Sequence, residues 1–110
     1  GIGLERAKIA WEKMIQEAMA NGTKIILMTP TPDLKEDILS ASSELAKHSS
    51  QIRLLAQKYQ IGLVDSYRLF QEIAKTEDLK DYMAQSNHIN EEGHEVVANA
   101  ILDFFSLESK

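Results

Sequence analysis

Apolar residues recur at two kinds of spacing along the chain, and the two spacings predict different elements. Over residues 4–19 and again from about 43 to 59, apolar residues return every three or four positions, which indicates amphipathic helices. The apolar runs at 24–29 (KIILMT) and 61–66 (IGLVDS) are short, contain β-branched residues and are followed by turn-forming or polar residues. Such runs are typical of strands buried on both faces of a parallel sheet.

Two further helices are predicted in the second half of the chain. A short one follows the second strand, with Asp65 or Ser66 as its N-cap and Leu69 and Phe70 among its apolar residues. The last helix begins near Asn90, a favourable cap, after a polar loop. The predicted order is helix, strand, helix, strand, helix, helix, and the connection between the strands is long enough for a right-handed crossover.

Two strands of this kind do not make a complete sheet. Strands that are apolar on both faces need helices above and below them and neighbouring strands beside them, and bare edges invite pairing with other chains. We therefore expect residues 1–110 to be the C-terminal part of a single, larger α/β domain. The missing strands would come from an N-terminal segment of the same protein or from a second copy of the chain. The alternative is that one predicted strand is helical and the fold is mostly α.

Composition narrows the class of protein but not its compartment. The chain is 44% hydrophobic and 26% charged, with a net charge of −5, which fits a soluble globular domain and argues against a nucleic-acid partner. We expect no membrane span, because no apolar run approaches the roughly 20 residues that one needs. Cysteine is absent and no signal peptide is visible, but the chain begins with glycine rather than methionine. Cytoplasmic and exported locations therefore both stay open.

The strongest candidate for chemistry is His88, in the string QSNHINEEGHEVVA at residues 85–98. The sequence predicts a polar loop here, between the last strand and the last helix, and loops at strand ends are where sites gather in open α/β sheets. Histidine changes charge close to neutral pH and is a common general base. Taken alone, it could equally be an ordinary surface residue.

The neighbouring polar residues offer weaker alternatives. We expect His94 to have a structural role, holding the loop by a hydrogen bond. A metal site from His88, His94 and an aspartate is disfavoured because the spacing H-x₅-H is not a recognised ligand pattern. Ser86 is not expected to be a nucleophile, since no Gly-x-Ser-x-Gly turn surrounds it. No cofactor is predicted.

The string from His88 to Ala98 resembles the C-terminal signature of the SGNH/GDSL hydrolases, whose common form is D-x-x-H-x-N-x-x-G-H. IILMTPTP at 25–32 and QIRLLAQKYQIGLVDSYRLF at 51–70 resemble other segments of the family in the same order. The resemblance implies a flavodoxin-like, three-layer α/β/α domain with a parallel sheet, which hydrolyses acyl or carbohydrate O-acyl esters. It makes His88 the general base, with Asn90, Gly93 and His94 as further members of the motif.

The chain departs from the family pattern in two ways. The family's Gly-Asp-Ser block, with its nucleophile, and its Gly-x-Asn-Asp block do not occur in this sequence. The chain alone is therefore expected to be inactive. The family's acidic partner stands three residues before the histidine, and here that residue is Gln85. Asp81 or Asp78 could replace it, Gln85 or a backbone carbonyl could orient the ring in a Ser-His dyad, or the parent protein could be an inactive relative.

The resemblance thus predicts that the chain supplies the general base of an ester hydrolase acting on small-molecule or carbohydrate esters. The alternative prediction is a non-catalytic α/β binding module or a degenerate hydrolase.

Overall fold

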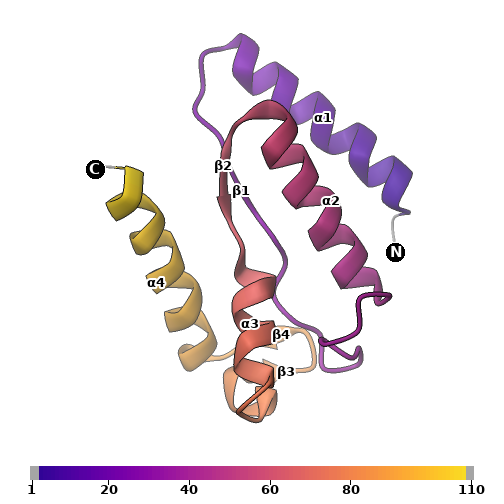
Figure 1. Ribbon diagram of the computed structural model, residues 1–110, viewed down its shortest axis with the longest axis vertical. Helices are drawn as coiled ribbons and strands as arrows, with labels where there is room; N and C mark the ends of the chain where they lie inside the picture. The colour runs from indigo at the N-terminus through magenta and orange to yellow at the C-terminus, as the bar shows by residue number, and fades with distance from the viewer. Residues whose placement is uncertain (1–2, 109–110) are drawn as a thin grey trace.

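The computed structural model describes residues 3–108, and its elements follow the predicted order (Figure 1). The elements are α1 (Leu4–Ala20), β1 (Ile26–Met28), α2 (Glu44–Tyr59), β2 (Gly62–Val64), α3 (Ser66–Ala74), the 3₁₀ helix η1 (Leu79–Tyr82), β3 (Met83–Gln85), β4 (His88–Ile89) and α4 (Glu91–Glu108). Both predicted strands are present but shorter than predicted. The segment predicted as a polar loop contains η1 and a small hairpin instead.

The helix boundaries follow from local capping chemistry. The Ser43 hydroxyl accepts a hydrogen bond from the backbone N–H of Ala46 at 3.2 Å and caps α2. Asp65, one of the two predicted caps, accepts from the N–H of Arg68 at 3.3 Å and caps α3. After α1, Gly22 adopts a positive φ of 73°, a conformation that ends helices.

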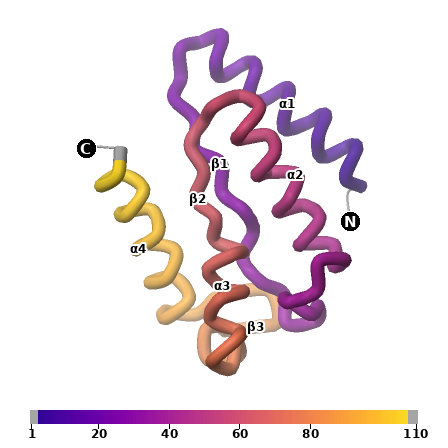
Figure 2. Tube along the Cα trace, viewed as in Figure 1, coloured from indigo at the N-terminus to yellow at the C-terminus, as the bar shows by residue number. Residues whose placement is uncertain are grey.

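β1 and β2 form a parallel pair, with Ile26 beside Gly62 and Met28 beside Val64. α1 and α2 lie on one side of the pair and α4 lies on the other (Figures 1 and 2). The arrangement is thus a compact mixed α/β fold with a two-stranded parallel sheet between helices. A second two-stranded sheet, the antiparallel pair β3–β4, lies at the end toward which β1 and β2 both run (Figure 1).

Two apolar clusters hold the elements together. The first lies between the sheet and the helices α1 and α2, and its buried members are Ile15, Leu27, Ile52, Leu55 and Ala56. The second lies around α3, and its buried members are Ile38, Ala46, Tyr67 and Phe70. Burying one of the larger of these side chains, such as Leu55 or Phe70, contributes about 1.5–3 kcal/mol to folding.

The prediction that β1 is buried on both faces is wrong for one of them. Leu27 is only 4% exposed, whereas Ile26 and Met28, which point to the opposite face, are 40% and 37% exposed. The cause is the position of α4, which packs on β2. Val64, beside Met28, is 4% exposed. On this face of the sheet, β2 is therefore covered by α4, and β1 is open.

A close contact fixes α4 against β2. A Cβ atom added to Gly62 would lie 2.6 Å from Cζ of Phe104, so only glycine lets the Phe104 ring approach the strand this closely. Gly62 therefore sets the spacing between the sheet and α4.

A buried polar network joins the carboxyl ends of the two parallel strands. The Thr29 hydroxyl donates to the Asp65 carboxylate at 2.8 Å and accepts from the backbone N–H of Tyr67 at 2.9 Å. Arg53, from α2, donates to both oxygens of that carboxylate, at 2.7 and 3.1 Å. Thr29 is 1% exposed, so its bonds replace those that water would otherwise make. The network links β1, β2, α2 and α3.

We predict that Thr29→Val lowers the free energy of unfolding by about 1–3 kcal/mol, because it leaves the buried N–H of Tyr67 without a partner while keeping the side-chain shape. Urea denaturation measures this, and Thr76→Val, at an exposed threonine, is the matched control. Equal losses in the two variants would show that the Thr29 hydroxyl contributes nothing specific.

The same network predicts a pH dependence. Burial, the largest single influence, raises the pKa of the Asp65 carboxyl, but hydrogen bonds from Arg53 and Thr29 and the Arg53 charge together outweigh it. The pKa therefore lies below its ordinary value of 3.8. The resulting stabilisation is fully present above the unfolded-state pKa and is lost as the pH falls through the folded-state pKa. We predict that the wild type loses free energy of unfolding more steeply below about pH 4 than Asp65→Asn does. Parallel pH profiles of the two proteins would contradict this.

Candidate functional site

His88 lies in a hairpin rather than in the predicted loop. It is in β4, opposite Gln85 of β3, while Ile89 pairs with Met83. Met83 is buried and anchors the hairpin, whereas His88 and Gln85 are exposed. The strand pairing was missed because segments of three and two residues are too short to give a periodic pattern. His88 therefore sits on an ordered backbone, at the carboxyl end of the parallel strands (Figure 1).

Asn90 joins the hairpin to α4 through both its backbone and its side chain. Its backbone N–H donates to the carbonyl of Tyr82 at 3.0 Å, and its side-chain amide donates to the carbonyl of Asp81 at 2.8 Å. Its Oδ1 accepts from the N–H of Gly93 at 3.0 Å, which caps α4 as predicted. Asn90, two residues after His88, thus fixes the direction in which the chain leaves the hairpin.

Gly93 allows α4 to lie directly against this junction. A Cβ atom at Gly93 would lie 2.5 Å from the backbone oxygen of Tyr82 and 2.6 Å from Cβ of Ile89. Backbone cannot move aside as a flexible side chain can, so a larger residue would push α4 away. Asn90 and Gly93 therefore have structural roles, and both act on the segment that carries His88.

The side chain of His94, the other histidine of the motif, does not help to hold this segment. The backbone N–H of His94 donates to the carbonyl of Asn90 at 2.8 Å, as the first turn of α4 requires. Its side chain is exposed and makes no hydrogen bond to any described residue. The side-chain hydrogen bond that the sequence predicted is therefore not formed within residues 3–108.

None of the predicted acidic or orienting side chains is hydrogen-bonded to the His88 imidazole within residues 3–108. The Asp78 carboxylate accepts from the N–H of Lys80 at 3.0 Å and caps η1. Asp81 meets Asn90 through its backbone carbonyl, and Gln85 is a ladder neighbour of His88. Within residues 3–108, the His88 side chain has no hydrogen bond or ion pair. The imidazole is thus an exposed group, open to a partner brought to it from outside this part of the chain.

A backbone contact that was not predicted from the sequence joins the hairpin to the loop after β1. The backbone N–H of Leu34 donates to the carbonyl of Ser86 at 2.6 Å. Ser86 therefore has a role through its backbone, and the loop after β1 lies next to the hairpin turn. Both loops at the carboxyl end of the sheet belong to one surface, the location at which open α/β sheets place their sites.

Other kinds of site find little support among the described residues. Over residues 3–108, no three histidine, aspartate or glutamate side chains gather closely enough to hold a metal ion. In the same range, no helix combines the length and the apolarity that crossing a membrane requires.

Comparisons of the chain with protein-family models, curated proteins and solved structures give no significant match.

We predict that Gly93→Ala lowers the free energy of unfolding by about 1–3 kcal/mol, because the added methyl group has no room beside the backbone of Tyr82. Gly3→Ala is the control, since a Cβ there meets nothing within 4 Å. Only a small loss, about 0.5 kcal/mol, is expected for it, from the change of the α1 N-cap. Urea unfolding midpoints of the two variants test the contact, and equal midpoints would contradict it.

Proposed function

We propose that this chain is the C-terminal part of an SGNH/GDSL-type ester hydrolase and that His88 is its general base. The observation that carries the proposal is the exposed His88 side chain at the carboxyl end of a parallel strand pair. The H-x-N-x-x-G-H string supports it further, because Asn90 and Gly93 hold the segment that presents His88.

The open side of the sheet gives the proposed hydrolase a place for its remaining strands. Within residues 3–108, β1 pairs with β2 on one side and with no strand on the other, and on the face shared with α4 its residues Ile26 and Met28 are exposed. The apolar surface continues onto α4 at Phe105, which is also exposed and borders the same hollow as Ile26. A strand added parallel to β1, with a helix over Ile26 and Met28, would cover this surface and complete a three-layer α/β/α domain. In the proposal these elements come from a preceding part of the same domain.

The added strands would also bring the nucleophile to His88. Parallel strands end at the same edge of a sheet, so a serine that follows a strand beside β1 would lie at the edge where His88 is exposed. His88 would take the proton of the serine hydroxyl as the serine oxygen bonds to the acyl carbon. It would then return the proton to the oxygen of the departing alcohol. Water would release the acid in a second, equivalent cycle. The substrates are acyl esters, including O-acyl esters of carbohydrates.

No acid is hydrogen-bonded to His88 within residues 3–108, and this favours a Ser-His dyad over a triad built on Asp81 or Asp78. Gln85 is beside His88 in the ladder and carries an amide instead of a carboxylate. The same observation supports a second candidate, a degenerate relative that binds its ligand without hydrolysis, because an unaided imidazole is a weaker catalyst.

The test uses the complete gene product that contains residues 1–110, assayed on 4-nitrophenyl acetate. We predict that His88→Ala lowers kcat/KM by about 10³-fold or more, because the serine loses its base. His94→Ala, at an exposed histidine on the adjoining helix, should leave kcat/KM close to that of the wild type. Residues 1–110 alone should be inactive.

Two results would overturn the proposal. Retention of most activity by His88→Ala would remove His88 from the mechanism. Absence of both esterase activity and covalent labelling by a fluorophosphonate in the complete protein would favour the binding relative.

A further inference from the structure

Asn21 and Gly22, at the carboxyl end of α1, form the only Asn-Gly pair in the sequence. The other three asparagines, Asn87, Asn90 and Asn99, are followed by histidine, glutamate and alanine. The side-chain amide of an asparagine can be attacked by the backbone nitrogen of the next residue, which closes a five-membered succinimide ring. A side chain on that next residue obstructs the attack, and glycine has none. Asn21 is therefore the asparagine of this chain with the least hindered path to ring closure.

The folded end of α1 holds this pair out of the reactive geometry. The backbone N–H of Gly22 donates to the carbonyl of Met19 at 3.0 Å. The N–H of Thr23 donates to the carbonyl of Ala18 at 2.9 Å, so the two bonds form a Schellman motif. The ψ of Asn21 is 3°, which eclipses the Gly22 nitrogen with the Asn21 nitrogen, whereas ring closure requires it to be eclipsed with Cβ. The ring can therefore close only after this end of the helix opens.

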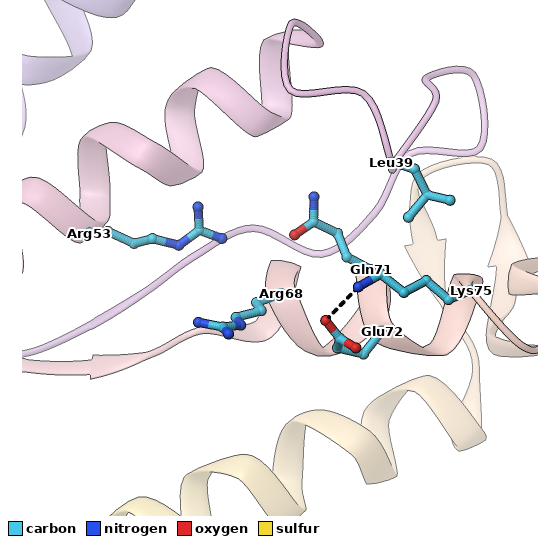
Figure 3. Close-up of a pocket in the computed structure, with 6 residues that line it drawn as sticks. All are labelled: Leu39, Arg53, Arg68, Gln71, Glu72 and Lys75. Carbon is cyan, nitrogen blue, oxygen red and sulfur yellow. Dashed lines mark hydrogen bonds and ion pairs between the residues drawn. The ribbon is translucent and has the colours of Figure 1, made fainter.

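The contacts that keep this end closed are few and lie at the surface. Residues 19–24 are all exposed, and a Cβ atom added to Gly22 would meet nothing within 4 Å. α2 has Lys58 in its last turn, and α3 ends at Lys75, which pairs with Glu72 at 3.0 Å (Figure 3). The last turn of α1 holds no basic residue, so it lacks the favourable charge that the carboxyl end of a helix attracts. Exposed helix ends of this kind open locally at little cost in free energy.

We propose that Asn21 is a site of spontaneous deamidation, which proceeds only while the last turn of α1 is open. The backbone nitrogen of Gly22 bonds to Cγ of Asn21, and the bond from Cγ to Nδ2 breaks. The side-chain nitrogen leaves as ammonia and takes with it the proton of the Gly22 nitrogen. Water then opens the ring at either of its two carbonyl carbons, which gives aspartate or isoaspartate. No other reactant takes part.

Both products weaken the closed end of α1. The Asn21 side-chain amide donates to the carbonyl of Glu17 at 3.1 Å, whereas a carboxylate cannot donate and is repelled by the negative end of the helix. Isoaspartate also adds an atom to the backbone, which breaks the spacing that the Schellman bonds need. Gly22 borders the same hollow as Ile26 and Phe105, so the change reaches the open surface beside β1. It involves no residue of the hairpin and is independent of the proposed esterase.

The test incubates the chain of residues 1–110 at mildly alkaline pH and follows its tryptic peptides by chromatography and mass spectrometry. The mass change from amide to acid is expected in the peptide of residues 14–24, as two separable products. It should be slower in the peptide of residues 81–110, which holds the other three asparagines. The rate at Asn21 should be higher in urea, where the helix is lost, than in buffer, because opening of α1 no longer limits the reaction.

Two exposed alanines of α1 supply matched variants. Ala20→Gly weakens the last turn and should raise the rate in buffer, relative to the rate of the same variant in urea, by up to about fivefold. Ala10→Gly makes the same change in the middle of the helix and should leave this ratio as in the wild type. Circular dichroism establishes that both variants are folded. Absence of product at Asn21, equal rates in buffer and urea, or equal acceleration by the two variants would overturn the proposal.

Discussion

The Asp65 carboxylate is the point at which the fold is joined. It follows the last residue of β2, caps α3, accepts two hydrogen bonds from Arg53 of α2 and one from Thr29 just after β1. A two-stranded parallel sheet of three residues per strand has few ladder bonds, so its register depends on contacts at its ends. The hydrogen bond from the N–H of Tyr67 to the Thr29 hydroxyl then fixes α3 to β1. The junction thus fixes where α3 begins, and from α3 the chain runs on to the hairpin with His88.

The sequence predicted the long, periodic elements and failed on the short ones, for a physical reason. α1, α2 and α4 each bury one apolar side, and a helix of four or five turns repeats that pattern often enough to be recognised. Each of the strands β1 and β2 gives only three residues, but the flanking turn residues mark where they end. The hairpin β3–β4 is too short to show a periodic pattern. It is held by the burial of Met83 and by its pairing with Ile89, which depend on tertiary contacts.

At the candidate site, sequence reasoning pointed to Asn90 and Gly93 but not to the tertiary contacts that they make. Asn90 was predicted as a helix cap and is one, yet its amide also holds Asp81, so one side chain joins η1, the hairpin and α4. The need for glycine at position 93 comes from the carbonyl of Tyr82, eleven residues earlier, and no local pattern reveals such an approach. The acid or orienting partner was sought among Asp78, Asp81 and Gln85. Asp78 caps η1 instead, and none of the three side chains is hydrogen-bonded to His88 within residues 3–108. A partner of His88 cannot be found by spacing alone because it depends on which side of the hairpin each residue faces.

The exposed surfaces of β1 and the exposed side chain of His88 have a common explanation in the proposed hydrolase. An apolar strand face with Ile26 and Met28 exposed is costly for an isolated chain, at about 25 cal/mol for each Å² of apolar surface left in water. An exposed imidazole with no hydrogen-bond partner among residues 3–108, held on a backbone as constrained as that around Asn90 and Gly93, has no evident structural use. A strand parallel to β1 with a helix over Ile26 and Met28 removes both anomalies at once, because the helix covers the apolar face and the strand ends at the edge where His88 is presented. Covering by a second copy in an antiparallel arrangement would satisfy only the first, since the carboxyl end of the added strand would then lie at the opposite edge, away from the hairpin. The need to account for both features favours a parallel strand.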